Sequence, residues 1–421
     1  MAEIQPLRAL HYDPTAAGPL DTLLAPPYDV IDAPMRSRLL DGSPFNVVEI
    51  DLPEDPEGGD PYAHAAATMR RWEDDGVLVR DDSPAFWILQ QDYTAPDGSR
   101  QARRGVFARV RVEDYGPGRI RPHERTHPGP KQDRLRLARA TKANLSPIFS
   151  LFPDPDRRAQ HAIEAGAANE PFAHADDHEG THNTLWRVTD PAVAKELQAA
   201  LADAELLIAD GHHRYETARA YAEEIGGEGD HRYVLMLLCS LGDPGLLVFP
   251  THRLLTGLKD RTDRQQALRD ALMRDFDVTA VEQQELEPTA ADPGIALGYM
   301  DSFHQQAYRV TLKDQAIANS ALPGKSESYR RLDTAVLEAL VLKGALGMSD
   351  DDISHLNGLA YSKSFDDALD AVQSGRADAG FFMRATPVDQ VREVAGAGES
   401  MPPKSTYFTP KVPTGLLFNP L

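Results

Sequence analysis

The chain is poor in cysteine and in long apolar segments, and each shortage excludes a class of protein. Cys239 is the only cysteine among 421 residues, so neither an intrachain disulfide nor a cysteine-rich metal site can form. It lies in the apolar segment 233–239, which predicts a buried strand and a packing role for the thiol. No segment approaches the ~20 apolar residues of a membrane-spanning helix, and the N-terminus lacks a signal-peptide pattern. We expect a cytoplasmic protein that makes no membrane contact.

Positive charge is also scarce. The chain has 44 Lys and Arg against 65 Asp and Glu, which gives a formal net charge of −21. A protein that binds nucleic acid needs a basic surface to neutralise phosphates. This balance therefore excludes nucleic acid as a partner. An anionic ligand would need a local basic pocket inside an acidic protein.

The composition is that of an ordinary globular protein, with 41% hydrophobic and 26% charged residues. Strand and helix signals alternate. Residues 85–93 and 103–112 predict paired strands around a Pro-Asp-Gly turn. Residues 45–52 predict a strand, and residues 334–346 predict a long helix. The fold class that these signals indicate is α/β to α+β, with mixed sheets.

A chain of this length is expected to form two or three domains. We expect three regions. They are an N-terminal α+β region over 1–200 with a basic loop at 119–134, a central strand–turn–helix region over 201–285, and a C-terminal α/β region over 286–421.

The most informative run lies between the apolar segment 206–208 and the helical segment 215–225. A strand, a glycine turn and a helix start follow one another there, in a strand–helix–strand pattern similar to βαβ. Such a turn directs unpaired backbone N–H groups at one point, where the helix dipole favours negative charge. The run, called the box below, is Asp210-Gly211-His212-His213-Arg214.

The side chains of the box suit phosphate chemistry. Arg214 offers a planar fork to phosphate oxygens, and His212 or His213 can donate or transfer a proton to developing charge. Asp210 would repel a phosphate unless a cation stood between them. It is therefore our candidate ligand for Mg²⁺. The ordinary alternative is a strand–turn–helix connection with no ligand.

A second cluster spans residues 119–134, with four Arg, one Lys and two His among sixteen residues. The Pro-Gly-Pro run at 128–130 predicts a rigid loop that presents donors to phosphates or carboxylates. Lys131 and Arg134 would hold a substrate carboxylate or a second phosphate. The alternative is a solvated loop paired with acidic neighbours. The candidate binding residues here are His123, Glu124, Arg125, Thr126, Lys131 and Arg134.

The same cluster contains the zinc-protease pattern H-E-x-x-H at 123–127. That chemistry needs both histidines on one helix, and the prolines that follow at once disfavour a helix. A zinc hydrolase is therefore the least favoured alternative. A second group of histidines at 174, 178 and 182, beside two aspartates, is interpreted as a solvated acidic loop.

Two proline-containing segments complete the candidates. Residues 25–30 form a stiff turn with a phenol and a carboxylate. Residues 401–407 carry an ammonium and hydroxyls suited to phosphate, from Lys404, Ser405 and Thr406. Either segment would equally serve as a buried connector.

Four motifs identify a family. With them the chain resembles the bacterial and archaeal family described as domain of unknown function 1015, and the likeness spans almost the whole length. The motifs are Ala25-Pro26-Pro27-Tyr28-Asp29-Val30, His123-Glu124-Arg125-Thr126, Gly129-Pro130-Lys131 and Met401-Pro402-Pro403-Lys404-Ser405-Thr406-Tyr407-Phe408.

The box itself resembles the phosphate-binding turn of the ParB/sulfiredoxin superfamily, and within it that of the ADP-dependent free serine kinases of archaea. The resemblance implies a ParB/sulfiredoxin-like core, elaborated by large insertions and a C-terminal α/β subdomain. By the same analogy Gly211 and Arg214 would bind the phosphates of ADP or ATP. Glu49 would accept the proton of the acceptor hydroxyl, with Glu124 as the alternative base.

The resulting hypothesis is a phosphotransferase that uses ADP or ATP with Mg²⁺ to phosphorylate a small hydroxylated metabolite. Serine is the acceptor by analogy, and other hydroxy acids or phosphosugars stay open. The alternative is a non-catalytic sensor of a nucleotide or phosphometabolite, which would need neither Glu49 nor a metal ion.

Overall fold

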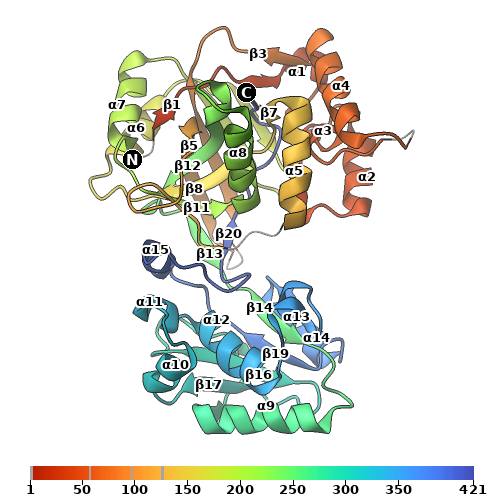
Figure 1. Cartoon of the computed structure of the whole chain (residues 1–421), viewed down its shortest axis with the longest axis vertical. Coiled ribbons are helices and arrows are strands. Elements are labelled where there is room, and N and C mark those ends of the chain that lie inside the picture. The colour runs from red at the N-terminus through yellow and green to blue at the C-terminus, as the bar shows by residue number, and fades with distance from the viewer. Residues whose placement is uncertain (1–2, 56–57, 96–97, 125–127) are drawn as a thin grey trace. The chain divides into compact units, whose positions relative to one another are not determined.

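The computed structural model describes residues 3–55, 58–95, 98–124 and 128–421. They form two compact units, each visible in Figure 1. Unit 1 holds the described residues of Met1–Pro122, Thr126–Leu246 and Pro410–Leu421, and unit 2 holds Leu247–Thr409 with His123 and Glu124. Unit 2 is thus an insertion, and the end of the chain returns to unit 1.

Unit 1 is built on a nine-stranded mixed sheet. The pairs β6–β11 and β8–β12 are parallel, and the other pairs are antiparallel. Every residue of β12 is buried, as expected of a strand covered on both faces. In sheet order the strands are β6 (Ile120–Arg121), β11 (Leu206–Asp210), β8 (Ile148–Phe152), β12 (Tyr233–Ser240), β5 (Arg100–Arg111), β4 (Phe86–Thr94), β10 (His182–Val188) and β9 (Ala173–Asp176), with β1 (Ile4–Gln5) beside β5.

The helices of unit 1 bring the candidate site together. α5 packs against both α4 and α8, and α3 packs against α4; Figure 1 shows α5 and α8 side by side. The principal helices are α2 (Ala33–Gly42), α3 (Val48–Asp51), α4 (Pro61–Asp74), α5 (Pro128–Thr141), α6 (Arg158–Gly166), α7 (Pro191–Leu201) and α8 (His212–Ile225).

Unit 2 contains a six-stranded antiparallel sheet and a short two-stranded ribbon of β13 (Leu247–Phe249) and β20 (Tyr407–Thr409). The sheet order is β15 (Phe276–Ala280), β17 (Tyr308–Leu312), β16 (Ala296–Asp301), β19 (Ala379–Phe382), β14 (His252–Leu255) and β18 (Leu359–Ser362). Its longer helices are α9 (Thr262–Asp275), α10 (Gln315–Ala321), α14 (Phe365–Gln373) and α15 (Val388–Gly396).

The predicted mixed α/β fold class is confirmed, since both units combine helices with mixed or antiparallel sheets. The paired strands are β4 and β5, and residues 96–97 of their turn lie outside the described residues. Cys239 is fully buried in β12, and burial raises the pKa of its thiol, as fits a packing role. Among the described helices, none has the length and apolar character that crossing a lipid bilayer requires.

The strand predicted at 45–52 is wrong, because this segment turns into the short helix α3. Asn46 causes the turn: its side chain accepts from the backbone N–H of Val48 at 3.0 Å and donates to the carbonyls of Thr22 and Leu24. Its apolar residues at 47, 48 and 50 are buried, and this spacing imitates part of a strand pattern. Glu49 is therefore a helical residue.

The basic loop predicted at 119–134 is also different in the structure. Residues 120–121 form β6, and α5 begins at Pro128. Proline is tolerated at a helix start, where no internal partner awaits its missing N–H. Lys131 and Arg134 accordingly lie on a helix. The helix predicted at 334–346 is confirmed as helical, but residues Leu337–Ala345 adopt π geometry after the single turn of α12 (Asp333–Val336).

The central strand–helix–strand pattern has an unexpected topology. β8 lies between β11 and β12, antiparallel to β11 and parallel to β12, so β11 and β12 run in opposite directions. They do not form a parallel βαβ unit. The central region is part of unit 1, and the division into two units differs from the three regions expected from the sequence.

The returning tail of the chain belongs to the core of unit 1. Phe418 is fully buried and packs edge-on against Tyr12, with ring centroids 5.8 Å apart. Phe418→Ala should lower the free energy of unfolding by about 3–5 kcal/mol. Hydrogen exchange should show faster opening in unit 1 peptides, while unit 2 peptides stay unchanged. Met273→Ala, at a side chain 60% exposed in unit 2, is the control.

Candidate functional site

The box forms the junction of β11 and α8, as its sequence predicts. Asp210 ends β11, Gly211 is the N-terminal cap residue, and the two histidines begin α8. No side chain caps this helix and no acidic residue lies in its first turn. His212 is buried and His213 is half-buried. The amide end of α8 therefore carries the partial positive charge of a helix start without a carboxylate from its own first turn.

Gly211 has two reasons to be glycine. Its φ of +97° lies in the left-handed region, which side chains with a Cβ adopt at a cost. A Cβ atom would also stand 2.9 Å from Nε of Arg214. The glycine thus lets the guanidinium fold back over the turn.

Asp210 is held between two cations. Its Oδ2 accepts from Nη2 of Arg214 at 2.7 Å and its Oδ1 accepts from Nζ of Lys411 at 3.0 Å. Arg214 also donates to the carbonyl of Pro147. Burial opposes ionisation of Asp210, yet Lys411 and Arg214 hold the pKa of its carboxyl well below the usual value. The carboxylate is ionised and fixes both cations at the box.

A second buried ion pair lies beside the box. Nη1 of Arg134 donates to Oδ1 of Asp51 at 3.2 Å and to its carbonyl at 2.6 Å, and the Ser146 hydroxyl donates to Oδ2 at 3.1 Å. The guanidinium also lies over the ring of Tyr28, 4.2 Å from its centroid. Burial raises the pKa of Asp51, whereas Arg134 and Arg214 oppose that rise.

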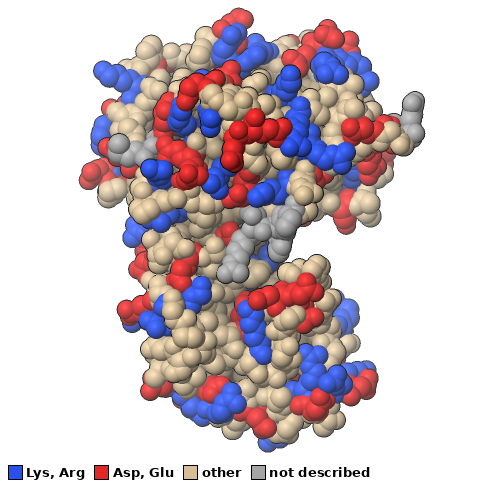
Figure 2. Space-filling view, in the orientation of Figure 1, with Lys and Arg blue, Asp and Glu red and all other residues tan. Residues whose placement is uncertain are grey.

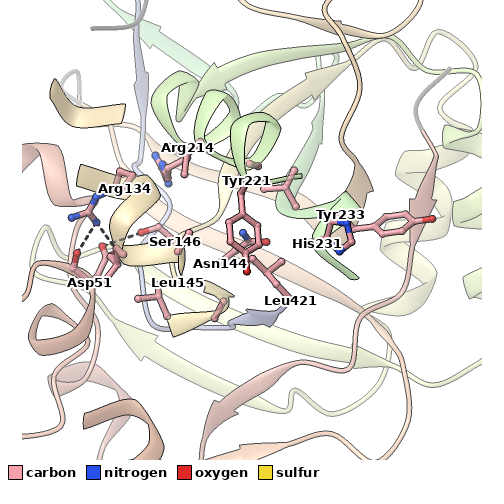
Figure 3. A pocket seen from close by; sticks show the side chains of 16 residues that line it. Asp51, Arg134, Asn144, Leu145, Ser146, Arg214, Tyr221, His231, Tyr233 and Leu421 are labelled. Atoms are coloured by element: carbon pink, nitrogen blue, oxygen red, sulfur yellow. Dashed lines mark hydrogen bonds and ion pairs between the residues drawn. The ribbon is translucent and has the colours of Figure 1, made fainter. Parts of the chain in front are cut away.

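Four of these residues line one side of a small cavity of about 50 Å³, namely Asp51, Arg134, Ser146 and Arg214. In Figure 3, Arg134 and Arg214 extend from α5 and α8 toward the side where Asp51 and Ser146 lie, and His231 stands on the other side. Nε of Arg214 is buried and has no hydrogen-bond partner in the described part of the chain. The Arg214 side chain, only 9% exposed, keeps this donor for a ligand or a water molecule.

Glu49 points away from this group. Its Oε1 lies 2.8 Å from Nε2 of His64 and its Oε2 lies 3.5 Å from Nη2 of Arg36. Residues two apart on a helix face different sides, so α3 directs Glu49 to α2 and α4 and Asp51 to α5. Of the acidic residues on α3, Asp51 is the one that contacts Arg134.

The remaining candidate on α5 is partly exposed. Nζ of Lys131 lies 3.5 Å from Oε2 of Glu216 on α8, with the lysine side chain 39% exposed. It is a surface ion pair, which leaves the ammonium accessible. The two residues that were predicted to bind a ligand together therefore differ: Lys131 is accessible, whereas Arg134 is buried in its ion pair with Asp51.

The other predicted residues form a second group, in unit 2. His123 is fully buried, its Nε2 lies 2.9 Å from the Thr406 hydroxyl, and its carbonyl accepts from the N–H of Met401. The Ser405 hydroxyl contacts the Thr334 hydroxyl and donates to the carbonyl of Pro402. These hydroxyls stabilise the loop at 401–407 through internal contacts, as expected if the segment is a buried connector.

Lys404 and Glu124 complete the unit 2 group. Lys404 has a left-handed φ of +56°, and its carbonyl accepts from buried Arg253 at 3.1 Å. Glu124 is half-buried and, like His123, lies outside any helix, so the described part of the H-E-x-x-H pattern lacks the helix that a zinc protease needs. The predicted residues Arg125 and Thr126, with residue 127, lie outside the described residues.

The contacts do not fit a resident metal ion at Asp210, because both of its oxygens already contact cationic groups. Within the ranges that the structure describes, no three His, Cys, Asp or Glu side chains gather as a metal site would need. Asp176 instead pairs with His182 at 2.7 Å on an exposed edge strand.

Charges on the surface of unit 1 are mixed. On the face that Figure 2 shows, acidic and basic residues are interspersed and the described residues make no broad basic surface. The positive charge that matters is inside, on Arg214, Lys411, Arg134 and Arg103. Arg103, only 1% exposed, is among the cations near Asp210.

Sequence reasoning missed Asp51, Lys411, His64 and Ser146. The only signal for Lys411 was a second Pro-Lys after the 401–408 motif, and Asp51 lay two residues from the nominated Glu49. Their partners are distant in the chain, so no local pattern identifies them.

Comparison with protein families gives one match over most of the chain. The model described as "Protein of unknown function (DUF1015)" matches residues 4–335. The chain belongs to this family. The motifs at 25–30, 123–126 and 129–131 lie in the range that defines DUF1015 membership, whereas the 401–408 motif and Lys411 lie beyond it. The membership predicted from the motifs is confirmed.

Solved structures similar to this DUF1015 chain are distant. A conserved hypothetical protein from Pyrococcus furiosus has 15% identity and a TM-score of 0.37, covering 74% of this chain and 95% of that one. A mutant free serine kinase in complex with AMP has 14% identity and a TM-score of 0.39, covering 74% and 92%. C-terminally truncated SbnI from Staphylococcus aureus has 12% identity and a TM-score of 0.37, covering 73% and 85%. A comparison with curated proteins gives no match.

The ion pair at the box predicts a pH-dependent stability. Asp210→Asn leaves two buried cations without their carboxylate, which should lower the free energy of unfolding by about 3 kcal/mol at neutral pH. The pKa of Asp210 is lowered in the folded protein. The ionised carboxylate therefore contributes its full stabilisation above about pH 3.9, the ordinary pKa of an aspartate, and this stabilisation is lost as the pH falls below that value.

Urea denaturation at neutral and at acidic pH tests this. The difference between wild type and Asp210→Asn should narrow as the pH falls from about 5 toward about 2. The matched control is Asp370→Asn, which removes an exposed pair with Arg376 and should change stability little. An equal loss in both variants would contradict the assignment.

Proposed function

We propose that this protein binds a nucleotide through its phosphates at the amide end of α8 and transfers a phosphoryl group to a small hydroxylated metabolite. One observation carries the proposal: Arg214 lies over the uncapped start of α8 with a buried Nε that lacks a hydrogen-bond partner among the described residues. A buried donor of this kind is costly unless a ligand or water satisfies it.

A phosphate is the ligand class that these donors suit best. The helix start supplies backbone N–H groups, Arg214 supplies a planar fork, and Lys411 raises the local positive charge. In unit 1, the helices α1 (Pro14–Ala17), α2, α4 and α7 each have a first-turn amide capped by an aspartate side chain, whereas α8 has no such cap. A carboxylate ligand would use the same donors less fully.

The choice of a nucleotide rests on the resemblance of the box to that of the ADP-dependent serine kinases, with ADP or ATP as the co-substrate. In the transfer step the terminal P–O bond of the nucleotide breaks and a new P–O bond forms to the acceptor oxygen. The hydroxyl proton passes to a carboxylate, for which we propose Glu49. The charge that develops on the phosphoryl oxygens is met by Arg214, with His212 or His213 as a further donor.

Magnesium enters the proposal only with the nucleotide. Mg²⁺ in phosphotransferases is usually held by substrate phosphates and one or two carboxylates. Asp210 is the carboxylate at the box, but its present contacts are to Arg214 and Lys411. We therefore assign it no resident metal ion.

A non-catalytic nucleotide or phosphometabolite sensor is the second candidate, and one observation favours it. Glu49, the proposed base, contacts His64 and Arg36, whereas Asp51 is the residue of α3 that contacts Arg134. A sensor needs the phosphate contacts but no base.

Nucleotide binding is tested by thermal shift with AMP, ADP, ATP, CTP, GTP and phosphoserine, with and without Mg²⁺. A ligand at ~100 times its Kd should stabilise the wild type by ~2.7 kcal/mol. Arg214→Ala should weaken the binding of the preferred nucleotide by at least about tenfold, since it removes the fork at the phosphate. Arg219→Ala, on the same helix but paired with exposed Asp114, should bind normally. Equal affinity in both variants would refute the phosphate assignment.

Catalysis is tested separately by phosphoryl transfer to serine and other hydroxy acids. Glu49→Gln should keep nucleotide affinity and lower the transfer rate by about 10²–10⁴-fold, because it removes the general base. The control is Glu54→Gln, since Glu54 is 69% exposed and also pairs with Arg36. Unchanged transfer in Glu49→Gln would exclude Glu49 as the base. Tight binding with no transfer to any acceptor would favour the sensor.

A further inference from the structure

The residue that faces Arg214 across Asp210 comes from the far end of the chain. Lys411 is the second residue of the tail that returns from unit 2 to unit 1, and its Nζ lies 3.0 Å from Oδ1 of Asp210. Its side chain is only 16% exposed. Lys411 lies beyond the range that the family model matches.

The backbone around Lys411 is fixed by two buried side chains of the central sheet. Nη2 of Arg103 donates to the carbonyl of Pro410 at 2.7 Å, and Nε2 of Gln91 donates to the carbonyl of Lys411 at 3.1 Å. Arg103 and Gln91 are each 1% exposed. Since their positions are set by β5 and β4, the ammonium is presented to the box from a rigid support.

Cationic groups gather at the amide end of α8. Asp210 contacts Arg214 and Lys411, and Arg103 is a third cation near the same carboxylate. The first turn of α8 contributes partial positive charge and no acid. The buried Nε of Arg214 has no hydrogen-bond partner among the described residues. An anion at the box would accept from this donor.

We propose that Lys411 is the second phosphate-binding residue of the site, and that Asp210 is a positioning residue which holds Lys411 and Arg214 apart on its two oxygens. The two cations then meet neighbouring phosphates, with the fork of Arg214 on one and the point charge of Lys411 on the next. The ligand class is a diphosphate or longer polyphosphate group rather than a monophosphate. This inference rests on the phosphate site of the proposed function and deepens it.

A purely structural Lys411 makes a different prediction. If its ammonium only ties the tail to Asp210, replacing it would alter stability and leave anion affinity unchanged. Binding of inorganic pyrophosphate therefore separates the two roles, and it does not depend on the identity of the nucleoside.

The experiment measures the affinity of the full-length protein for pyrophosphate, phosphate and ADP by calorimetry. The wild type should bind pyrophosphate at least tenfold more tightly than phosphate. Lys411→Gln should lose at least tenfold in pyrophosphate affinity and reduce the preference over phosphate, while Lys411→Arg should keep most of both. Lys325→Gln is the matched control, because Lys325 makes a similar ion pair with Glu399 at 3.3 Å in unit 2.

A second measurement uses the wild type alone, in case Lys411→Gln fails to fold. Acylation of lysines followed by mass spectrometry should show Lys411 protected several-fold by pyrophosphate and Lys325 unaffected. Unchanged pyrophosphate affinity in a folded Lys411→Gln variant, or no protection of Lys411, would overturn the proposal. If pyrophosphate binds but none of the nucleotides does, the phosphate-binding role of Lys411 is supported and the proposed nucleotide binding is refuted. Binding of no phosphate compound would overturn both.

Discussion

The site depends on one carboxylate that keeps two cations in place. Asp210 contacts Arg214 through one oxygen and Lys411 through the other, and each contact is sheltered from water. Without the carboxylate, the two cations would repel each other and move toward solvent. Gly211 then allows the guanidinium to lie over the start of α8. The geometry of the box is thus a consequence of Asp210, which sequence reasoning had interpreted as a metal ligand.

The interior of unit 1 contains several arginines although the chain as a whole is acidic. Arg103, Arg134 and Arg214 are buried although the net charge of the chain is −21. Each is supported by carbonyls, a carboxylate or an aromatic face, as buried arginines require. Such a distribution favours small anions that reach the buried cations over large polyanions, which need a broad basic surface.

The features predicted correctly from the sequence are local in the chain, and those missed depend on contacts between distant residues. The box, its glycine turn and the start of α8 were predictable because the strand, turn and helix signals are contiguous. The segment at 45–52 was misread because the buried Asn46 turn depends on carbonyls at Thr22 and Leu24. Lys411 and Asp51 could not be assigned, since their partners Asp210 and Arg134 become neighbours only through sheet order and helix packing. Likewise, the hydroxyls of Ser405 and Thr406 suited phosphate by type, but the folded loop uses them internally.

The insertion of unit 2 between Leu246 and Pro410 gives the site an order of assembly. During synthesis from the N-terminus, the box emerges with its aspartate and arginine long before Lys411 exists. The whole of Leu247–Thr409 is made in between, and it can fold while unit 1 still lacks Phe418 from its core. A nascent or truncated chain ending within unit 2 would therefore have Asp210 and Arg214 but not Lys411. The proposed phosphate site would be complete only in chains in which the tail has joined unit 1.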